Sequence, residues 1–237
     1  MTTDSSDKSA LFDIHTAPAK AMKYLREFDE AVQSKGFPCI FVPLAFRHND
    51  LLFGLADVSA GYQQIVLLFN AAVQSIMENS NQTIVLWIEG AGTNNLEEDK
   101  NLASAILKEL LTADQTPWPA SAPTNPNDPN WDFWYGGVDF FINFSTPHHV
   151  KRRSRNLGSA FTLVIQSRST FDHIGKNPMQ IRHRIRERIA QYDAISISPA
   201  LGEHGNAPEL PQFFLGDDNI EASMLLTEQD ILSRIKR

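Results

Sequence analysis

Two adjacent histidines and a run of cations are the residues of this chain best suited to chemistry. His148 and His149 come shortly after the apolar run at residues 138–144. Four cationic side chains follow them: Lys151, Arg152, Arg153 and Arg155. An imidazole nitrogen can ligate a metal ion or a haem iron, and guanidinium groups bind carboxylates and phosphates. The segment predicts a metal or anion site at the end of a buried strand, with surface histidines and a solvated basic run as the alternative.

The residues near the two histidines narrow the metal chemistry. Neighbours on an extended chain point to opposite sides, so one imidazole is expected to be the ligand and the other its partner. Zinc or non-haem iron requires several ligands, and no acidic residue or further histidine lies at ligand spacing. Cys39 is the single cysteine, which excludes a thiolate zinc site. Axial ligation of haem iron requires one histidine, and this segment can provide it.

Four other residues are candidates, each with a structural alternative. Cys39 can be a nucleophile or a thiolate haem ligand, although its apolar neighbours also fit a buried, inert thiol. Glu89 ends a predicted buried strand, where sites of α/β proteins are built, and can either bind a substrate cation or cap the strand. Gln166 and Arg168 lie at the end of another apolar run, so they are candidates for the same reason and have the same structural alternative.

The composition limits the partners. The chain has 237 residues, of which 42% are hydrophobic, and a formal net charge of −7. A sizeable core can therefore form, while binding to nucleic acid or acidic membranes is not expected. Residues 1–10 are polar, and no apolar run approaches the ~18 residues that cross a bilayer. These features predict a soluble cytoplasmic protein.

The spacing of apolar residues predicts helices and strands in alternation. Helices are expected at residues 17–34, 61–78, 96–111, 178–192 and 227–236. Strands are expected at residues 37–46, 51–58, 82–89, 131–135, 138–144 and 159–166, with a tight turn at 47–50 that joins the first two into a hairpin. Because hairpins and crossovers both occur, the expected fold class is α/β (α+β), with a central mixed β-sheet flanked by helices.

A single domain is expected at residues 16–237, after a disordered lead-in at residues 1–15. Residues 112–130 contain five prolines, which disfavour regular structure and predict a long loop. Trp118 and Trp131 bracket this loop and are expected to hold it against the body of the protein.

Several motifs, in this order along the chain, resemble the YqcI/YcgG family. They are residues 37–41, 118–119, 128–133, 146–155, 161–168, 198–202 and 212–219. The resemblance covers roughly residues 20–220, which is nearly the whole chain. The sequence departs from the family pattern at His204 and at residues 208–212, which lie in the tail. If the tail covers the distal pocket, these departures change the class of substrate.

The resemblance implies a haem-dependent N-oxygenase. Characterised members are similar to enzymes that hydroxylate the nitrogen of guanidines or amines, with haem b, O₂ and electrons from an external donor. The resemblance makes His149 the axial ligand of the iron, and lets Glu89 hold a guanidinium group. The predicted catalytic residues are Glu89 and His148, and the predicted cofactor-binding residues are His149, Arg152, Arg153, Arg155, Gln166, Arg168 and Cys39.

In this reading the arginines pair with haem propionates or with a substrate carboxylate. The expected partners are a small guanidine or amine, O₂ and an electron donor, and a homodimer is one expected state. The alternative function is a haem-binding or haem-sensing protein without turnover, or a small-molecule binding module.

Overall fold

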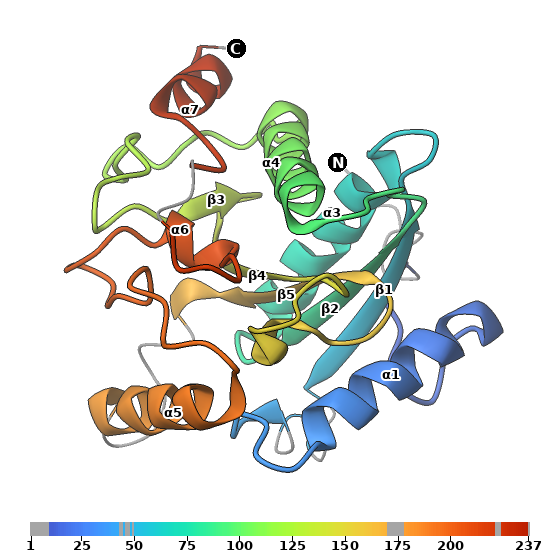
Figure 1. Ribbon diagram of the computed structural model, residues 1–237. Coiled ribbons are helices and arrows are strands. Elements are labelled where there is room, and N and C mark those ends of the chain that lie inside the picture. Colours follow the sequence, from blue (N-terminus) through green and yellow to red (C-terminus); the bar gives the residue numbers. More distant parts are fainter. Residues whose placement is uncertain are drawn as a thin grey trace.

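The structure of this chain is a computed structural model that describes residues 10–42, 45, 48, 50–169, 178–220 and 224–236. In this part of the chain, five strands form one sheet in the order β1-β2-β5-β4-β3 (Figure 1). The strands are β1 (Leu51–Asp57), β2 (Thr83–Glu89), β3 (Phe133–Tyr135), β4 (Val138–Ser145) and β5 (Phe161–Ser167). β1 and β2 are parallel, and the other neighbouring pairs are antiparallel. The predicted mixed sheet of an α/β protein is confirmed.

Helices cover both faces of the sheet. They are α1 (Met22–Gln33), α3 (Gln63–Glu78), α4 (Leu96–Ala113), α5 (Pro178–Tyr192), α6 (Leu210–Phe213) and α7 (Glu228–Ile235), with the short 3-10 turns η2 (Ala19–Ala21) and η3 (Arg153–Arg155). α3 and α4 lie on one face, and α1 and α5 lie on the other (Figure 1). The helices predicted at residues 61–78, 96–111 and 178–192 are confirmed.

The sequence of β2 explains the two covered faces. Alternate side chains of a strand point to opposite faces of its sheet. Ile84, Leu86 and Ile88 enter the core beneath α3 and α4. Val85 and Trp87 enter a second core beside α1. β2 is a continuous apolar run because neither of its faces is left to solvent.

The strand predicted at residues 37–46 and the hairpin that it would form are wrong for the residues that the structure describes. Residues 37–41 form bends and irregular backbone and pair with no strand, and Arg47 and Asn49 lie outside the described residues. Pro38 has no N–H to donate to a ladder. The apolar side chains of Phe37, Phe41 and Val42 line a cavity instead. Apolar composition marks burial, and in this segment burial does not require a sheet.

The lead-in predicted at residues 1–15 is too long, because its last part pairs with the sheet. Residues 1–9 lie outside the described residues. The backbones of Phe12 and Phe53 exchange both hydrogen bonds, at 2.9 and 2.8 Å. The Phe12 ring lies 6.3 Å from the Phe53 ring and 6.4 Å from the Trp87 ring, between centroids. The segment therefore covers the outer edge of β1.

The predicted proline-rich loop is confirmed, since no helix or strand occurs between the end of α4 and the start of β3. Trp131 is completely buried in the core. The Trp118 ring packs against α7, where the guanidinium carbon of Arg234 lies 5.2 Å from its centroid. The two tryptophans hold the loop against the body, as expected. Among the described residues, no helix combines the length and the apolar character needed to cross a membrane.

Replacing Phe12 tests whether this segment contributes to stability. Phe12→Ala removes a half-buried ring from Phe53 and Trp87, and should lower the free energy of unfolding by about 1–3 kcal/mol in urea titrations. The matched control is Leu67→Ala, because the Leu67 side chain is 48% exposed. The control should change stability by no more than about 0.5 kcal/mol. Equal effects of the two substitutions would contradict the pairing.

Candidate functional site

A cavity of about 510 Å³ lies between the sheet and the elements on its α1 and α5 side. Val85, Phe141 and Val164 form its apolar floor, from β2, β4 and β5. The facing walls come from residues 37–42, from α5 and from the tail at residues 201–215. Cavities of this size that are mainly apolar, with a few convergent polar groups, are the usual sites for small molecules and cofactors.

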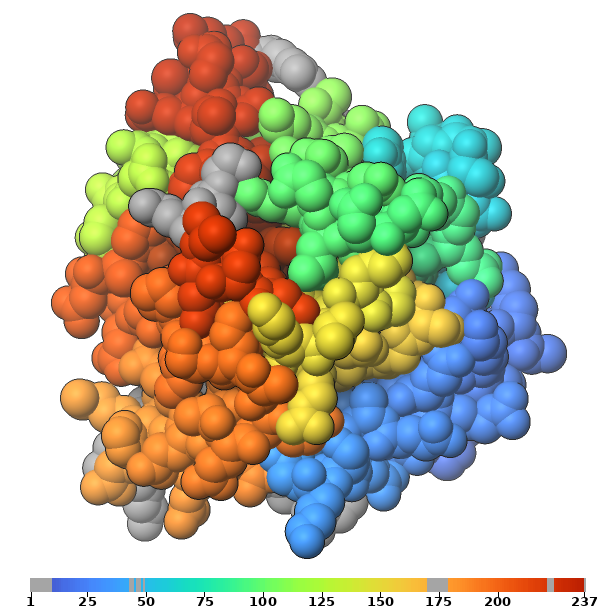
Figure 2. All heavy atoms as spheres, viewed as in Figure 1, coloured from blue at the N-terminus to red at the C-terminus, as the bar shows by residue number. Residues whose placement is uncertain are grey.

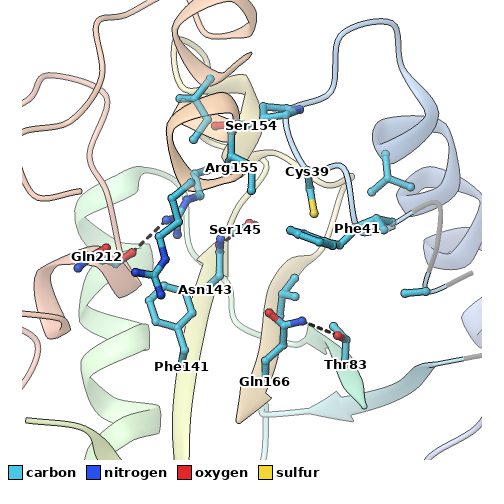
Figure 3. Close-up of a pocket in the computed structure, with 18 of the residues that line it drawn as sticks. Cys39, Phe41, Thr83, Phe141, Asn143, Ser145, Ser154, Arg155, Gln166 and Gln212 are labelled. Carbon is cyan, nitrogen blue, oxygen red and sulfur yellow. Dashed lines mark hydrogen bonds between the residues drawn. The ribbon is translucent and has the colours of Figure 1, made fainter. Parts of the chain in front are cut away.

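Polar side chains stand among the apolar ones on the floor (Figure 3). Gln166 donates a hydrogen bond to Thr83 Oγ1 over 2.6 Å, and Ser145 donates to Asn143 Oδ1 over 3.1 Å. The Cys39 thiol points toward the cavity from the opposite wall (Figure 3). Burial raises the pKa of Cys39, so it is a thiol at neutral pH while nothing is bound to it.

Arg155 is a buried cation on the cavity wall. Its Nη1 and Nη2 donate to the carbonyls of Phe213 and Gln212 over 3.2 and 3.0 Å (Figure 3). No carboxylate of the described residues forms an ion pair with it. Burial, and then the neighbouring Arg152 cation, lower the pKa of Arg155 to about 9. An anion that entered the cavity would offset the cost of burying the Arg155 charge and its repulsion from Arg152.

Arg152 and Asp217 fasten the tail over the cavity. Arg152 is 1% exposed, and its Nε and Nη2 donate to Gly216 O over 2.9 Å and to Asn219 Oδ1 over 2.5 Å. Asp217 accepts from the backbone N–H groups of Val150, Lys151 and Arg152 over 2.7, 2.8 and 2.9 Å. Figure 2 shows the yellow segment that contains the basic run beside the red tail. We name these contacts the tail clamp.

Arg153 and Lys151 do not take part in the cavity. Arg153 donates to the Tyr192 carbonyl, and its guanidinium carbon lies 4.9 Å from the centroid of the Tyr192 ring. Lys151 is exposed. The basic run therefore divides between an interior pair, Arg152 and Arg155, and side chains that hold the end of α5 or meet solvent.

His149 lies one layer behind the cavity wall. The ring is buried, and its Nε2 donates to the carbonyl of Leu215, a wall residue, over 2.7 Å. The buried Nδ1 has no hydrogen-bond partner among the described residues. Burial lowers the pKa of His149, although the bond to Leu215 opposes this, so the ring is neutral and Nδ1 carries a lone pair.

His148 belongs to a separate polar contact outside the cavity. Its Nδ1 lies 2.7 Å from Oδ2 of Asp99, which is completely buried near the start of α4. Thr146 Oγ1 donates to the same carboxylate oxygen. These contacts tie the segment after β4 to α4.

Glu89 also lies away from the cavity, at the end of β2. It accepts a hydrogen bond from the Tyr24 hydroxyl over 2.7 Å. Burial and this bond raise the pKa of Tyr24 to about 12. In the described structure Glu89 therefore fixes α1 to the sheet.

The structure brings an acidic group to the cavity that the sequence does not reveal. Glu209 Oε1 lies 2.8 Å from Arg168 Nε, and His204 Nε2 lies 3.1 Å from Asp132 Oδ1. The carboxyl groups of Glu209 and Asp132 also face each other. Burial raises the pKa of Glu209 to about 8, with Arg168 acting against the rise and Asp132 adding to it. Glu209 stands between Pro208 and Pro211 in the tail, where the sequence signal is an acid four residues before the apolar run at 213–215.

The cavity thus collects some of the predicted site residues. The residues on its wall are Cys39, Arg152, Arg155, Gln166 and Arg168, and those away from it are Glu89, His148, His149 and Arg153. His48 is an imidazole on the wall that sequence reasoning missed, and its Nδ1 lies 3.8 Å from Asp50 Oδ2. Among the residues that the structure describes, no group of three or more His, Cys, Asp or Glu side chains is placed to hold a metal ion.

The chain belongs to the YqcI/YcgG family, which matches residues 28–224. It is 32% identical over 201 residues to the "Putative N(omega)-hydroxy-L-arginine synthase DcsA" of Streptomyces lavendulae, a match that covers 78% of this chain and 75% of that protein. It is 32% identical over 133 residues to YqcI of Bacillus subtilis (strain 168), covering 54% of this chain and 52% of YqcI. It is 33% identical over 137 residues to YcgG of the same organism, covering 54% of this chain and 53% of YcgG. No solved structure matches the chain with significance.

Asp217→Ala tests the tail clamp. The substitution leaves three backbone N–H groups without their acceptor, and should lower the free energy of unfolding by about 3 kcal/mol at pH 7. Burial opposes ionisation of Asp217, but the N–H groups outweigh it and the net pKa is lowered. A carboxyl group whose pKa is lowered by folding stabilises the folded protein when the pH is above the ordinary pKa of the group. This stabilisation is lost as the pH falls through the lowered pKa. The difference between the variant and the wild type should therefore shrink in acid.

Asp218→Ala is the matched control for this substitution. Asp218 is the next residue, and its Oδ1 accepts one hydrogen bond, from the Ile220 backbone over 3.1 Å. Denaturant titrations should place the control within about 0.5 kcal/mol of the wild type. If the two aspartates cost the same, Asp217 does not fasten the tail.

Proposed function

We propose that this protein hydroxylates the nitrogen of a small guanidine or amine, with haem b in the cavity, O₂, and electrons from an external donor. The observation that carries the proposal is the cavity itself: about 510 Å³, apolar on its floor, with Arg155 on one wall and the Glu209 carboxyl group on another. The likeness to a relative whose name refers to N-hydroxy-L-arginine synthesis supports a guanidine substrate.

The residues of the cavity fit a haem in two respects. A haem requires an apolar slot and cations for its propionates. The aromatic and aliphatic wall provides the slot, with Phe41, Phe141 and Val164 among its members. Arg155 provides a buried cation that forms no ion pair with a described carboxylate, since Asp193, which acts on it, lies 4.0 Å from Arg152 instead; such a cation can pair with a propionate.

Two imidazoles could ligate the iron of a bound haem. A metal-bound imidazole commonly donates its second N–H to a carbonyl or a carboxylate. His149, the ligand proposed from the resemblance, donates Nε2–H to Leu215 O and keeps the Nδ1 lone pair, but it lies behind the wall. His48 lies on the wall, with Asp50 on the Nδ1 side of its ring.

The protein residues have distinct roles in this proposal. The haem supplies the activation of O₂ when it is bound. Phe41 and Phe141 keep water from the reacting atoms, and an apolar surrounding strengthens each charge interaction in the cavity. Arg155 holds a carboxylate, either of the cofactor or of the substrate. The tail clamp keeps Leu215 and Glu209 in place over the cavity.

The absorption spectrum of the purified chain tests the cofactor, and mass analysis tests the reaction. Protein from haem-supplemented cells should have a Soret band that shifts on reduction and with CO. With L-arginine, O₂ and an added reductant it should form a product heavier by one oxygen atom. A colourless protein that does not take up haemin would refute the proposal. A red protein that oxidises no guanidine or amine would instead be the alternative, a haem-binding or sensing protein.

Imidazole rescue distinguishes the two axial candidates in the same preparation. A His→Gly substitution at the true ligand should change the Soret band, and added imidazole should restore the wild-type spectrum. At the other histidine, the glycine variant should show no response of the spectrum to imidazole. If neither His48→Gly nor His149→Gly responds, another wall residue is the ligand.

A further inference from the structure

The Glu209 carboxyl group lies on the cavity wall, and the carboxyl group of Asp132, which does not line the cavity, is next to it. Glu209 directly precedes α6, and its side chain is 5% exposed. Its Oε1 contacts Arg168, while its buried Oε2 has no hydrogen-bond donor among the described residues. The other neighbour of this side chain is the carboxyl group of Asp132, which is itself an acceptor when ionised. Two facing acceptors require a proton or a cation between them.

The charges around this pair do not balance. Arg168 contacts Glu209, and His204 contacts Asp132. A third carboxylate, Asp139, acts on Asp132 and accepts from Ser167 Oγ over 2.6 Å. On α5, Arg186 already pairs with Glu203 over 3.5 Å. Among the described residues, the three carboxyl groups thus have one ion pair with an arginine, from Arg168 to Glu209, and one contact with an imidazole, from His204 to Asp132.

We propose that Glu209, with the Asp132 carboxyl group behind it, is the subsite that binds the cationic guanidinium or ammonium group of the substrate, which replaces a proton shared by the two carboxyl groups. The proposal rests on the proposed function for the choice of cavity. A guanidinium group suits Glu209, because its planar N–H donors match the geometry of a carboxylate. Glu209 lies on the cavity wall, whereas Glu89, the acid first predicted for this role, does not.

The exchange of a proton for a cation sets the pH dependence of binding. Burial is the main reason that the Glu209 pKa is about 8, and burial also raises the pKa of Asp132. Below pH 8 the pair holds a proton that the incoming cation must displace. The affinity for a cation should therefore rise about tenfold per pH unit up to pH 8 and then level off, with about one proton released at pH 7.

Calorimetric titration of the full chain, in the cofactor state in which it is purified, tests this exchange. L-arginine is the cationic probe, and L-citrulline is a neutral probe of nearly the same shape. Buffers of different ionisation enthalpy report the number of protons released. The wild type should prefer L-arginine, release a proton at pH 7, and bind L-arginine more tightly as the pH rises from 6 to 8.

Glu209→Gln keeps the shape of the side chain and removes the titrating group. It should weaken L-arginine binding by about 10–100-fold, abolish proton release, and leave L-citrulline bound as tightly as before or more tightly. Asp132→Asn should do the same, and serves if the first variant does not fold. His204→Gln tests whether the imidazole beside Asp132 is the source of the released proton instead. This variant should still release a proton when it binds L-arginine.

Three results would overturn the proposal. The first is Glu209→Gln protein that binds L-arginine with wild-type affinity and proton release. The second is an equal loss of L-arginine and L-citrulline, as expected of a purely structural pair. The third is wild-type protein that binds neither L-arginine nor agmatine. Failure of the proposed function is separate: the wild type would bind L-arginine with proton release and yet form no oxygenated product.

Discussion

The tail clamp is the interaction on which the candidate site depends. A buried guanidinium group at Arg152 and three backbone N–H groups bind residues 216–219 of the tail. Charged groups are costly to bury unless they are hydrogen-bonded, and the tail supplies the bonds of Arg152 Nε and Nη2, so other positions of the tail are disfavoured. The clamp thereby fixes Leu215 against His149, and fixes α6 against the sheet through the rings of Phe141 and Phe213, whose centroids are 5.3 Å apart.

The two faces of the sheet have different tasks. Beneath α3 and α4 the apolar side chains form a continuous core. On the other face, α1 and α5 stand apart enough to leave the cavity, and α5 holds the segment at residues 37–38 through bonds from Arg188 to its carbonyls. The first face stabilises the fold, while the second exposes the floor of β2, β4 and β5 to a ligand. The residues proposed for function therefore come from segments far apart in the sequence.

Sequence patterns predicted the parts of the fold that local periodicity controls. The apolar runs of β2 and β5 and the helical spacing of α5 each arise within one element, and they were found. The strand expected at residues 37–46 was wrong, because an apolar run that lines a cavity looks the same as one that enters a sheet. Asp132 and Glu209 were missed as a pair because only the closure of the tail brings them together. His149 was singled out by its neighbours in sequence, while its position is set by Leu215, 66 residues away.

Filling the cavity tests most directly whether it is the reaction site. Val164 lies on the floor of the cavity in β5, and Val150 is 74% exposed on the surface. Val164→Phe and Val150→Phe make the same chemical change in these two places, and circular dichroism checks that each variant is folded. The account predicts that Val164→Phe takes up far less haemin per chain and forms little oxygenated L-arginine, while Val150→Phe matches the wild type. Wild-type haemin uptake and product formation by folded Val164→Phe protein would contradict it.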